Sequence, residues 1–216
     1  TNGCMAEIGG YVVNFFKWYA EMADKYFGKI ATTGPSALAL ITREPVGVAG
    51  AVLPWNFPLV MATWKIAPAL AVGCSAVIKP AEQTPLSTIR LAQLMEEAGV
   101  PAGVINIVPG FGETAGAAIG LHKDIDTVSF TGSTEVGRMF MRYASDSNLK
   151  GVGLEMGGKS PFIVLEDAVI DDDLIDHAAM SAFWNGGQNC TANMRQLIAA
   201  PRVEEFTGRI IERVKA

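Results

Sequence analysis

Two residues with reactive side chains lie in unusual glycine-rich settings. Cys190 occupies the small-residue stretch Gly186–Ala192 at the end of an apolar helical pattern, and Glu155 lies in Leu154–Pro161. A thiolate is a strong nucleophile whose reactivity depends on its exposure and neighbours, and a separate carboxylate can serve as its base. The pair therefore indicates covalent catalysis. On local grounds alone, a buried structural thiol beside a helix end is the commoner explanation of Cys190.

Two glycine-rich segments are predicted to join a strand to a helix. In Phe130–Gly137, free backbone N–H groups at a helix N-terminus would attract phosphate. This segment is not a P-loop, because Arg138 follows Gly137, and it does not match GxGxxG. The glycines of Val108–Gly116 would permit close approach of a flat ligand. An ordinary capped turn explains the first segment equally well and is the favoured explanation of the second.

An ammonium and a carboxylate lie three residues apart in Ile78–Glu82, at the end of a predicted strand. Because open parallel sheets bind ligands at the carboxyl ends of their strands, Lys79 and Glu82 could hydrogen-bond two ribose hydroxyls. Glu82 would repel a 2′-phosphate, which favours NAD over NADP. On local evidence alone, a surface ion pair of little energetic weight is the favoured explanation.

Asn56 lies between two prolines and two aromatic residues in Leu53–Pro58. A rigid amide there could donate to a developing oxyanion, and one such donor contributes roughly 3–4 kcal/mol to a transition state. The alternative is a turn asparagine that satisfies the local backbone. His177 lies in the middle of a predicted helix, and no spacing joins it to Cys190. We therefore interpret His177 as a structural residue and not as part of a Cys–His dyad.

Short apolar strands alternate with helical patterns along most of the chain. Residues 8–27 predict a helix capped by Gly28, and residues 32–44 predict an extended connector or edge hairpin. Thr84 and Pro85 have the residue types preferred at the start of a helix. The predicted strands are 48–53, 76–79, 104–108, 127–130, 153–156, 161–165 and 195–199, and the other predicted helices are 59–72, 84–98, 114–121, 135–145, 171–184 and one from 203. This alternation predicts an α/β fold with a parallel sheet covered on both faces.

The composition argues against several classes of protein. Half of the 216 residues are apolar, 18% are charged and the net charge is −5, so we expect no disorder and no nucleic-acid or membrane partner. Lys65 interrupts the best candidate for a membrane span. Cys4, Cys74 and Cys190 show no framework spacing, which indicates thiols in a reducing compartment. Two histidines are too few for a zinc site. We therefore expect a cytoplasmic protein without a metal.

Together, these motifs resemble those of the aldehyde dehydrogenase superfamily, in the family's order and over nearly the whole chain. The family usually has Leu at the position of Met156, and Ala192–Arg195 departs from its more usual small-residue-Ser-Arg pattern. The matching motifs are Pro54–Pro58, Lys79–Glu82, Phe130–Ser133, Leu154–Pro161 and Gly187–Cys190.

The resemblance implies the oxidation of an aldehyde to a carboxylic acid. Cys190 would attack the carbonyl to form a thiohemiacetal and then a thioester, while Asn56 and the backbone N–H of Cys190 hold the oxyanion. Glu155 would activate the water that hydrolyses the thioester. The implied partners are a small-molecule aldehyde and, in the full-length form, further copies of the chain in a dimer or tetramer.

The resemblance also implies NAD as the cofactor, with NADP as the alternative. Lys79 and Glu82 would hold the adenine-side ribose, and Gly132 and Ser133 the pyrophosphate. The other residues expected to bind the cofactor are Leu53, Pro54, Trp55, Gly112, Gly116, Phe130 and Met156, with the two glycines near the adenine.

The implied fold is a Rossmann-like parallel-sheet cofactor domain plus the first part of a second α/β catalytic domain. We expect a cofactor-domain helix at 1–31, an oligomerisation hairpin or connector at 32–45, the NAD-binding domain at 46–155 and part of the catalytic domain at 156–216. Because the chain starts at Thr1 without Met and ends inside a helical pattern, we expect a fragment. The resemblance implies a polypeptide of roughly twice this length or more with most of the catalytic domain missing here, so we expect the fragment to be inactive in isolation.

Two alternatives differ in the fate of the acyl group. A CoA-acylating or phosphorylating relative would pass the thioester to another acceptor, and the presence of Glu155 argues against it. A non-catalytic protein on the same scaffold is disfavoured because Cys190, Glu155 and Asn56 occur together. Amino-aldehydes, aliphatic aldehydes and semialdehydes all remain open as substrates.

Overall fold

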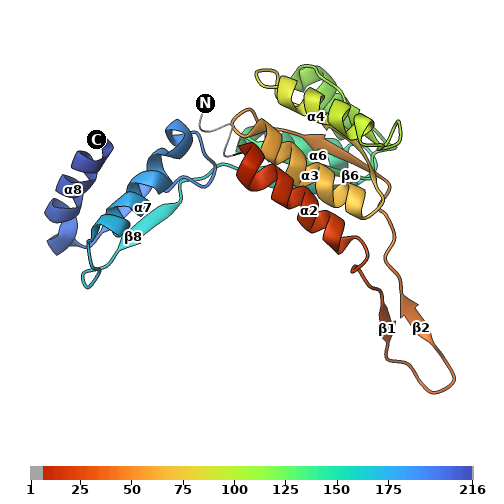
Figure 1. The fold of residues 1–216 in the computed structure, drawn as a ribbon. Coiled ribbons are helices and arrows are strands. Elements are labelled where there is room, and N and C mark those ends of the chain that lie inside the picture. The colour runs from red at the N-terminus through yellow and green to blue at the C-terminus, as the bar shows by residue number, and fades with distance from the viewer. Residues whose placement is uncertain (1–6, 216) are drawn as a thin grey trace. The chain divides into compact units, whose positions relative to one another are not determined.

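Two compact units make up the chain. The computed structural model describes residues 7–215, with one unit ending at Glu155 and the other running from Met156 (Figure 1). Each unit has its own buried cluster of apolar side chains. None of the helices in residues 7–215 is long and apolar enough to cross a membrane.

A five-stranded sheet with the order β5-β4-β3-β6-β7 forms the centre of the first unit. Strand β3 pairs in parallel with both β4 and β6, and β4 pairs in parallel with β5. The chain builds outward from β3 to β5 and then crosses back to place β6 on the other side of β3. The strands are β3 (Val48–Val52), β4 (Ser75–Lys79), β5 (Ile105–Ile107), β6 (Thr127–Gly132) and β7 (Gly151–Met156).

Helices cover both faces of this sheet, which confirms the predicted α/β fold. On one face, Ala51 and Ile78 pack with Ile66 of α3 and Met95 of α4. Because side chains alternate along a strand, the neighbouring Val52 contributes to the opposite core, where α5 and α6 pack. The helical segments are η1 (Glu7–Val12), α2 (Val13–Met22), α3 (Pro58–Ala71), α4 (Leu86–Glu97), η2 (Gly112–Gly116), α5 (Ala117–Leu121) and α6 (Thr134–Ser145).

The amino-terminal helix is shorter than the sequence predicts. It ends at Met22, so the assignment of Gly28 as its cap is wrong. Gly28 instead precedes an antiparallel hairpin of β1 (Lys29–Ala31) and β2 (Ala39–Ile41). A Cβ atom at Gly28 would lie 2.6 Å from the carbonyl oxygen of Ile41, so glycine permits the close approach of the two strands.

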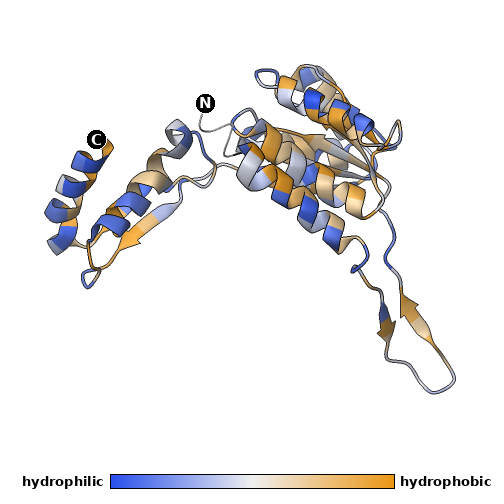
Figure 2. Cartoon of the chain, in the orientation of Figure 1, coloured by the Kyte–Doolittle hydropathy of each residue, from blue (hydrophilic) through white to orange (hydrophobic). Residues whose placement is uncertain are grey.

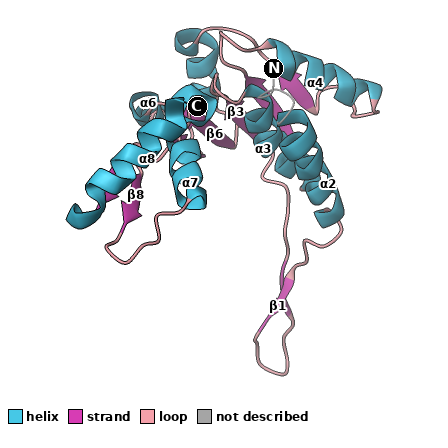
Figure 3. Cartoon of the chain, turned by 60° about the vertical axis from the view of Figure 1, so that its left-hand side comes forward, coloured by secondary structure: helices cyan, strands magenta, loops and turns pink. Residues whose placement is uncertain are grey.

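The hairpin extends away from the sheet and helices of its unit in two views (Figures 1 and 3). Most of its strand residues are apolar (Figure 2). Its large apolar side chains are exposed, by 73% at Ile30, 73% at Leu38 and 61% at Leu40. A sheet of two strands has no buried face of its own, so this surface lacks a partner among residues 7–215.

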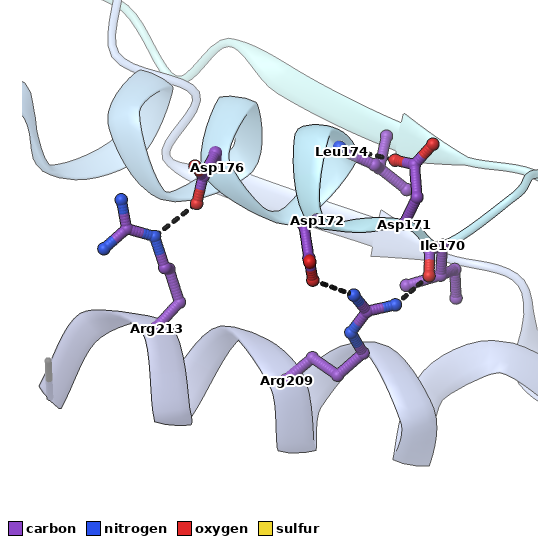
Figure 4. A network of polar contacts seen from close by, with 7 residues as sticks. All are labelled: Ile170, Asp171, Asp172, Leu174, Asp176, Arg209 and Arg213. Carbon is purple, nitrogen blue, oxygen red and sulfur yellow. Dashed lines mark hydrogen bonds and ion pairs between the residues drawn. The ribbon is translucent and has the colours of Figure 1, made fainter.

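The second unit contains two parallel strands covered by two helices. Val164, Ile175 and Phe206 are buried at its centre. Arg209 and Arg213 of the last helix form ion pairs with Asp172 and Asp176 of the preceding one (Figure 4). Its elements are β8 (Pro161–Val164), α7 (Asp172–Phe183), η3 (Trp184–Gly187), β9 (Arg195–Ile198), η4 (Ala200–Arg202) and α8 (Val203–Lys215).

Candidate functional site

The predicted ribose-binding pair forms at the end of β4. Lys79 Nζ lies 3.0 Å from Glu82 Oε1 and also donates a hydrogen bond to the carbonyl of Pro80 at 2.9 Å. The Lys79 side chain is 3% exposed, whereas Glu82 is 35% exposed. The lysine of the pair is therefore buried in the protein, while the glutamate is accessible to solvent. In an ordinary surface ion pair, both side chains are exposed.

Two glycines of η2, the segment that follows β5, lie beside this pair. The backbone N–H of Gly112 donates to the Glu82 carboxylate. Burial raises the pKa of Glu82, but its own backbone N–H, Lys79 and the Gly112 N–H outweigh that effect and hold the pKa below its usual value. A Cβ atom at Gly116 would lie 3.6 Å from Lys79 Cδ. The structure thus brings Lys79, Glu82, Gly112 and Gly116 together, although more than thirty residues separate the first from the last.

The junction after β6 has the geometry of an anion site at a helix N-terminus. Ser133 is the N-cap of α6, and its Oγ accepts a hydrogen bond from the N–H of Val136 at 3.2 Å. The N–H groups of a first helical turn lack intrahelical acceptors, so the turn can bind phosphate. A Cβ atom at Gly132 would lie 2.6 Å from Cζ of Phe130, so this position requires glycine. The capped-turn and phosphate explanations are compatible, because the cap uses only one N–H.

The turn that carries Asn56 follows β3, between the two junctions just described. The N–H of Leu53 donates to the carbonyl of Lys79 at 2.9 Å, and Pro58 begins α3. Thr84 does not cap α4 as predicted, because Pro85 occupies the N-cap position. The hydroxyl of Thr84 instead donates to the carbonyl of Trp55 at 3.3 Å. Asn56 itself is half-buried in this braced turn.

These turns lie at the carboxyl ends of neighbouring parallel strands. The strand order reverses between β3 and β6, so the Asn56 turn and the Gly132–Ser133 junction flank the switch point of the sheet. Ligands of open α/β sheets bind at this position. Glu155 and Met156 end the adjacent strand β7, where the side chain of Glu155 is exposed.

Lys65, whose charge interrupts the apolar sequence of α3, lies near Glu155, and its pattern in the sequence predicted no role in a site. Its Nζ donates to Ser129 Oγ at 2.9 Å. Burial lowers the pKa of Lys65 to about 8, and the Glu155 carboxylate partly opposes that shift. A single lysine in a helix with apolar residues on all faces was the available signal, because a buried charge needs a partner.

Cys190 lies in an irregular loop between η3 and β9. Its side chain is exposed, so the interpretation as a buried structural thiol is wrong; that description fits Cys74. Asn185 and Gly186 adopt positive φ angles of 53° and 66°, which turn the chain sharply before the cysteine. Within residues 7–215, the Cys190 N–H donates no backbone hydrogen bond.

The residues around Cys190 form a compact turn. Asn189 Oδ1 accepts hydrogen bonds from the N–H and the Oγ1 of Thr191, at 3.2 and 3.0 Å. The carbonyl of Asn189 accepts from the N–H of Ala192 at 3.2 Å. His177 Nδ1 lies 2.7 Å from the carbonyl oxygen of Asp173 in its own helix, as expected of a structural histidine.

Comparison with known proteins assigns this arrangement to a family. The model of the aldehyde dehydrogenase family matches residues 3–216. The chain belongs to the aldehyde dehydrogenase family. An aminoacetaldehyde dehydrogenase from Pseudomonas aeruginosa is 51% identical over 198 residues, which cover 92% of this chain and 40% of the relative. The chain therefore spans about two fifths of the length of the curated relatives that it matches.

Solved structures of aldehyde dehydrogenases have the same fold. The γ-glutamyl-γ-aminobutyraldehyde dehydrogenase of Burkholderia cenocepacia superposes with a TM-score of 0.92 at 48% identity, over 94% of this chain and 41% of its own. A mutant of indole-3-acetaldehyde dehydrogenase from P. syringae, solved in complex with NAD+ and IAA, gives a TM-score of 0.90 at 47% identity. That match covers 94% of this chain and 42% of the other.

Proposed function

We propose that the protein oxidises an aldehyde to a carboxylic acid, with NAD as cofactor and Cys190 as the nucleophile. The observation that carries this proposal is the exposed thiol of Cys190 in a chain of the aldehyde dehydrogenase family. NAD+ in the P. syringae structure supports the choice of cofactor.

The first unit suits a dinucleotide at the ends of its strands. Lys79 and Glu82 would hold a ribose, and the turn of Gly132 and Ser133 would receive the pyrophosphate. Gly112 and Gly116 lie directly beside the Lys79–Glu82 pair, since Cβ atoms at these positions would be in van der Waals contact with it at 3.9 and 3.6 Å. The accessible Glu82 carboxylate disfavours a 2′-phosphate, so NAD is preferred over NADP. Leu53, Pro54, Trp55, Phe130 and Met156 would complete the cofactor contacts.

The chemistry on this chain takes place at one sulfur atom. The Cys190 thiolate adds to the aldehyde carbon, and the oxygen becomes an oxyanion that accepts from the Asn56 amide and the Cys190 N–H. The bound nicotinamide supplies the acceptor for the hydride that this carbon loses. Cys190 then holds the acyl group as a thioester.

Hydrolysis of the thioester requires a base. The Glu155 carboxylate takes a proton from water, the resulting hydroxide adds to the acyl carbon, and the C–S bond breaks. The products are the carboxylic acid and the free thiolate, and Glu155 releases its proton to solvent. Its exposed position gives water access to the carboxylate.

The decisive experiment traps the acyl group on the protein. In the protein at its full length, mass spectrometry after rapid quenching with NAD and propanal should find the propionyl mass on the Cys190 peptide, and none on buried Cys74. A label on another residue would refute the assignment of the nucleophile. Acyl-CoA formed without free acid when CoA is added would refute hydrolysis and support the acylating alternative.

The exposed apolar hairpin supports a second, structural proposal: that it contacts another copy of the chain in a homo-oligomer. Ile30, Leu38 and Leu40 are all more than half exposed. Replacement of Leu40 by Lys should lower the molar mass measured by light scattering, and an unchanged mass would exclude the hairpin as a contact.

The unpaired thiols of Cys74 and Cys190 support a reducing, cytoplasmic environment.

A further inference from the structure

One asparagine connects the loop of Cys190 to three separate elements of the second unit. Asn193 Nδ2 donates to the carbonyl of Pro161 at 3.0 Å. Its backbone N–H donates to the carbonyl of Ser181 at 3.0 Å, and its own carbonyl accepts from Gln196 Nε2 at 3.1 Å. These partners lie at the start of β8, in α7 and in β9.

The side chain of Asn189, next to Cys190, makes hydrogen bonds of a different kind, which stay within the loop. Asn185, Gly186 and Gly187 have positive φ angles. After Asn193, Met194 Sδ accepts from Lys159 Nζ at 3.4 Å, and the N–H of Arg195, the first residue of β9, donates to the carbonyl of Ser160 at 3.3 Å. Asn193 is therefore the first residue after Cys190 that attaches the turn to the strands and to α7.

Of these three hydrogen bonds, only the one from the Asn193 side chain depends on the type of residue at this position. Backbone groups of any residue could bond Ser181 and Gln196, but only a side-chain donor of this length reaches Pro161. The sequence departs at this position from the small residue that is more usual in the family. A small residue cannot supply that donor.

We propose that Asn193 is a positioning residue for Cys190, which holds the nucleophile's turn in place through the bond from its amide to Pro161. This proposal rests on the function proposed above. The reaction requires the sulfur and the Cys190 N–H to keep a fixed geometry relative to the aldehyde, and small displacements of reacting groups are costly in rate. The amide restricts the turn without touching the substrate.

The test compares two variants with a matched control, all in the protein at its full length. Asn193→Asp keeps the size of the side chain but places a carboxylate oxygen against the Pro161 carbonyl, and Asn193→Ala removes the group. Asp171→Ala is the control, because it also removes one hydrogen bond from the second unit, at the far end of α7 from Ser181. Steady-state kinetics and hydrogen exchange of residues 186–194 are measured well below the unfolding temperature.

Both Asn193 variants should lower kcat roughly tenfold while the KM for NAD stays within twofold, because the displaced group is the nucleophile and not the cofactor site. Amides of residues 186–194 should exchange faster in both, and Asp171→Ala should change neither property. A kcat within twofold of the unmodified protein in both Asn193 variants would overturn the proposal, as would an equal loss in Asp171→Ala. Full turnover by Cys190→Ala would instead refute the proposed function.

Discussion

The two units hold their predicted functional residues by different means. In the first unit, Lys79 and Gly132 end strands of a sheet with buried cores on both faces, and Glu82 lies three residues beyond one of these ends, so the strand ends fix their positions. In the second, Cys190 lies in an irregular loop above a sheet of two strands, and hydrogen bonds of single side chains fix the turn. The predicted cofactor residues are thus positioned by packing, whereas the predicted nucleophile lies in a loop that we propose is held by hydrogen bonds. Substitutions in the first unit should therefore leave the reactivity of Cys190 unchanged, and substitutions in the Cys190 loop should leave the affinity for NAD unchanged.

The largest effect should come from Cys190→Ala. Removal of the nucleophile should lower kcat at least about 1000-fold, because the covalent route is lost. The dissociation constant for NAD, measured by calorimetry, should stay within twofold, since the predicted cofactor residues lie in the first unit or at its end. Weakened NAD binding in this variant would show that the two properties are not separable.

Lys79→Met should have the complementary effect. It removes a buried ammonium and leaves Glu82 without its ion pair, so the dissociation constant for NAD should rise roughly 10- to 100-fold. The rate at which iodoacetamide alkylates Cys190 should not change. Lys123→Met, which alters an exposed lysine of the same unit, serves as the control. An unchanged affinity for NAD would exclude the Lys79–Glu82 pair from the cofactor site.

The sequence predicted the positions of the strand-end residues in the first unit more completely than the Cys190 loop in the second, for the same physical reason. Alternating apolar strands and helices specify a parallel sheet, and residues after strands must then gather at one edge, as Lys79, Asn56 and Ser133 do. The exposure of Cys190 depends on backbone angles at Asn185 and Gly186, which no periodicity encodes. The bond from Asn193 to Pro161 joins residues that are 32 positions apart in an irregular loop.

Two local misassignments have a similar origin. Thr84 has the right residue type for an N-cap, but tertiary contact with the Trp55 carbonyl uses its hydroxyl instead. Gly28 has the right type for a helix end, but the close approach of Ile41 is what requires it. In both cases the residue type signalled a constraint, while only the fold could show which partner imposed it.

Substitution of Lys65 should change how the stability of the first unit depends on pH. The pKa of Lys65 is about 8 in the folded chain and 10.5 in its ordinary state, so between these values the unfolded chain binds more protons. The free energy of unfolding should therefore rise as the pH increases from 8 to 10.5. Below pH 8, Lys65 is charged in both states, and the whole destabilisation from burying its ammonium group should be present. Lys65→Met should raise the free energy of unfolding at pH 7 by about 2 kcal/mol, after the shift is discounted for partial solvation.

The measurement is urea unfolding of the first unit at pH 7 and at pH 10.5, with Lys17→Met at an exposed position of α2 as the control. The variant should be more stable than the unmodified chain at pH 7, and the difference should shrink at pH 10.5. A variant that is less stable than the unmodified chain by the same amount at both pH values would mean that the lost bond to Ser129, and not the charge, determines the effect.

The smallest effect should come from Asp171→Ala in the second unit. Asp171 Oδ1 accepts from the N–H of Leu174 at 2.8 Å, and loss of such a cap costs about 1 kcal/mol. The Arg209–Asp172 pair cannot compensate, because the Asp172 side chain is 99% exposed and water screens the attraction. Asp173→Ala is the control, since it removes a charge from the same turn without removing the cap. The melting temperature of the second unit should fall only in Asp171→Ala. An equal fall in both variants would assign the effect to charge near the end of the helix. The second unit would then depend less on individual hydrogen bonds than its Cys190 loop indicates.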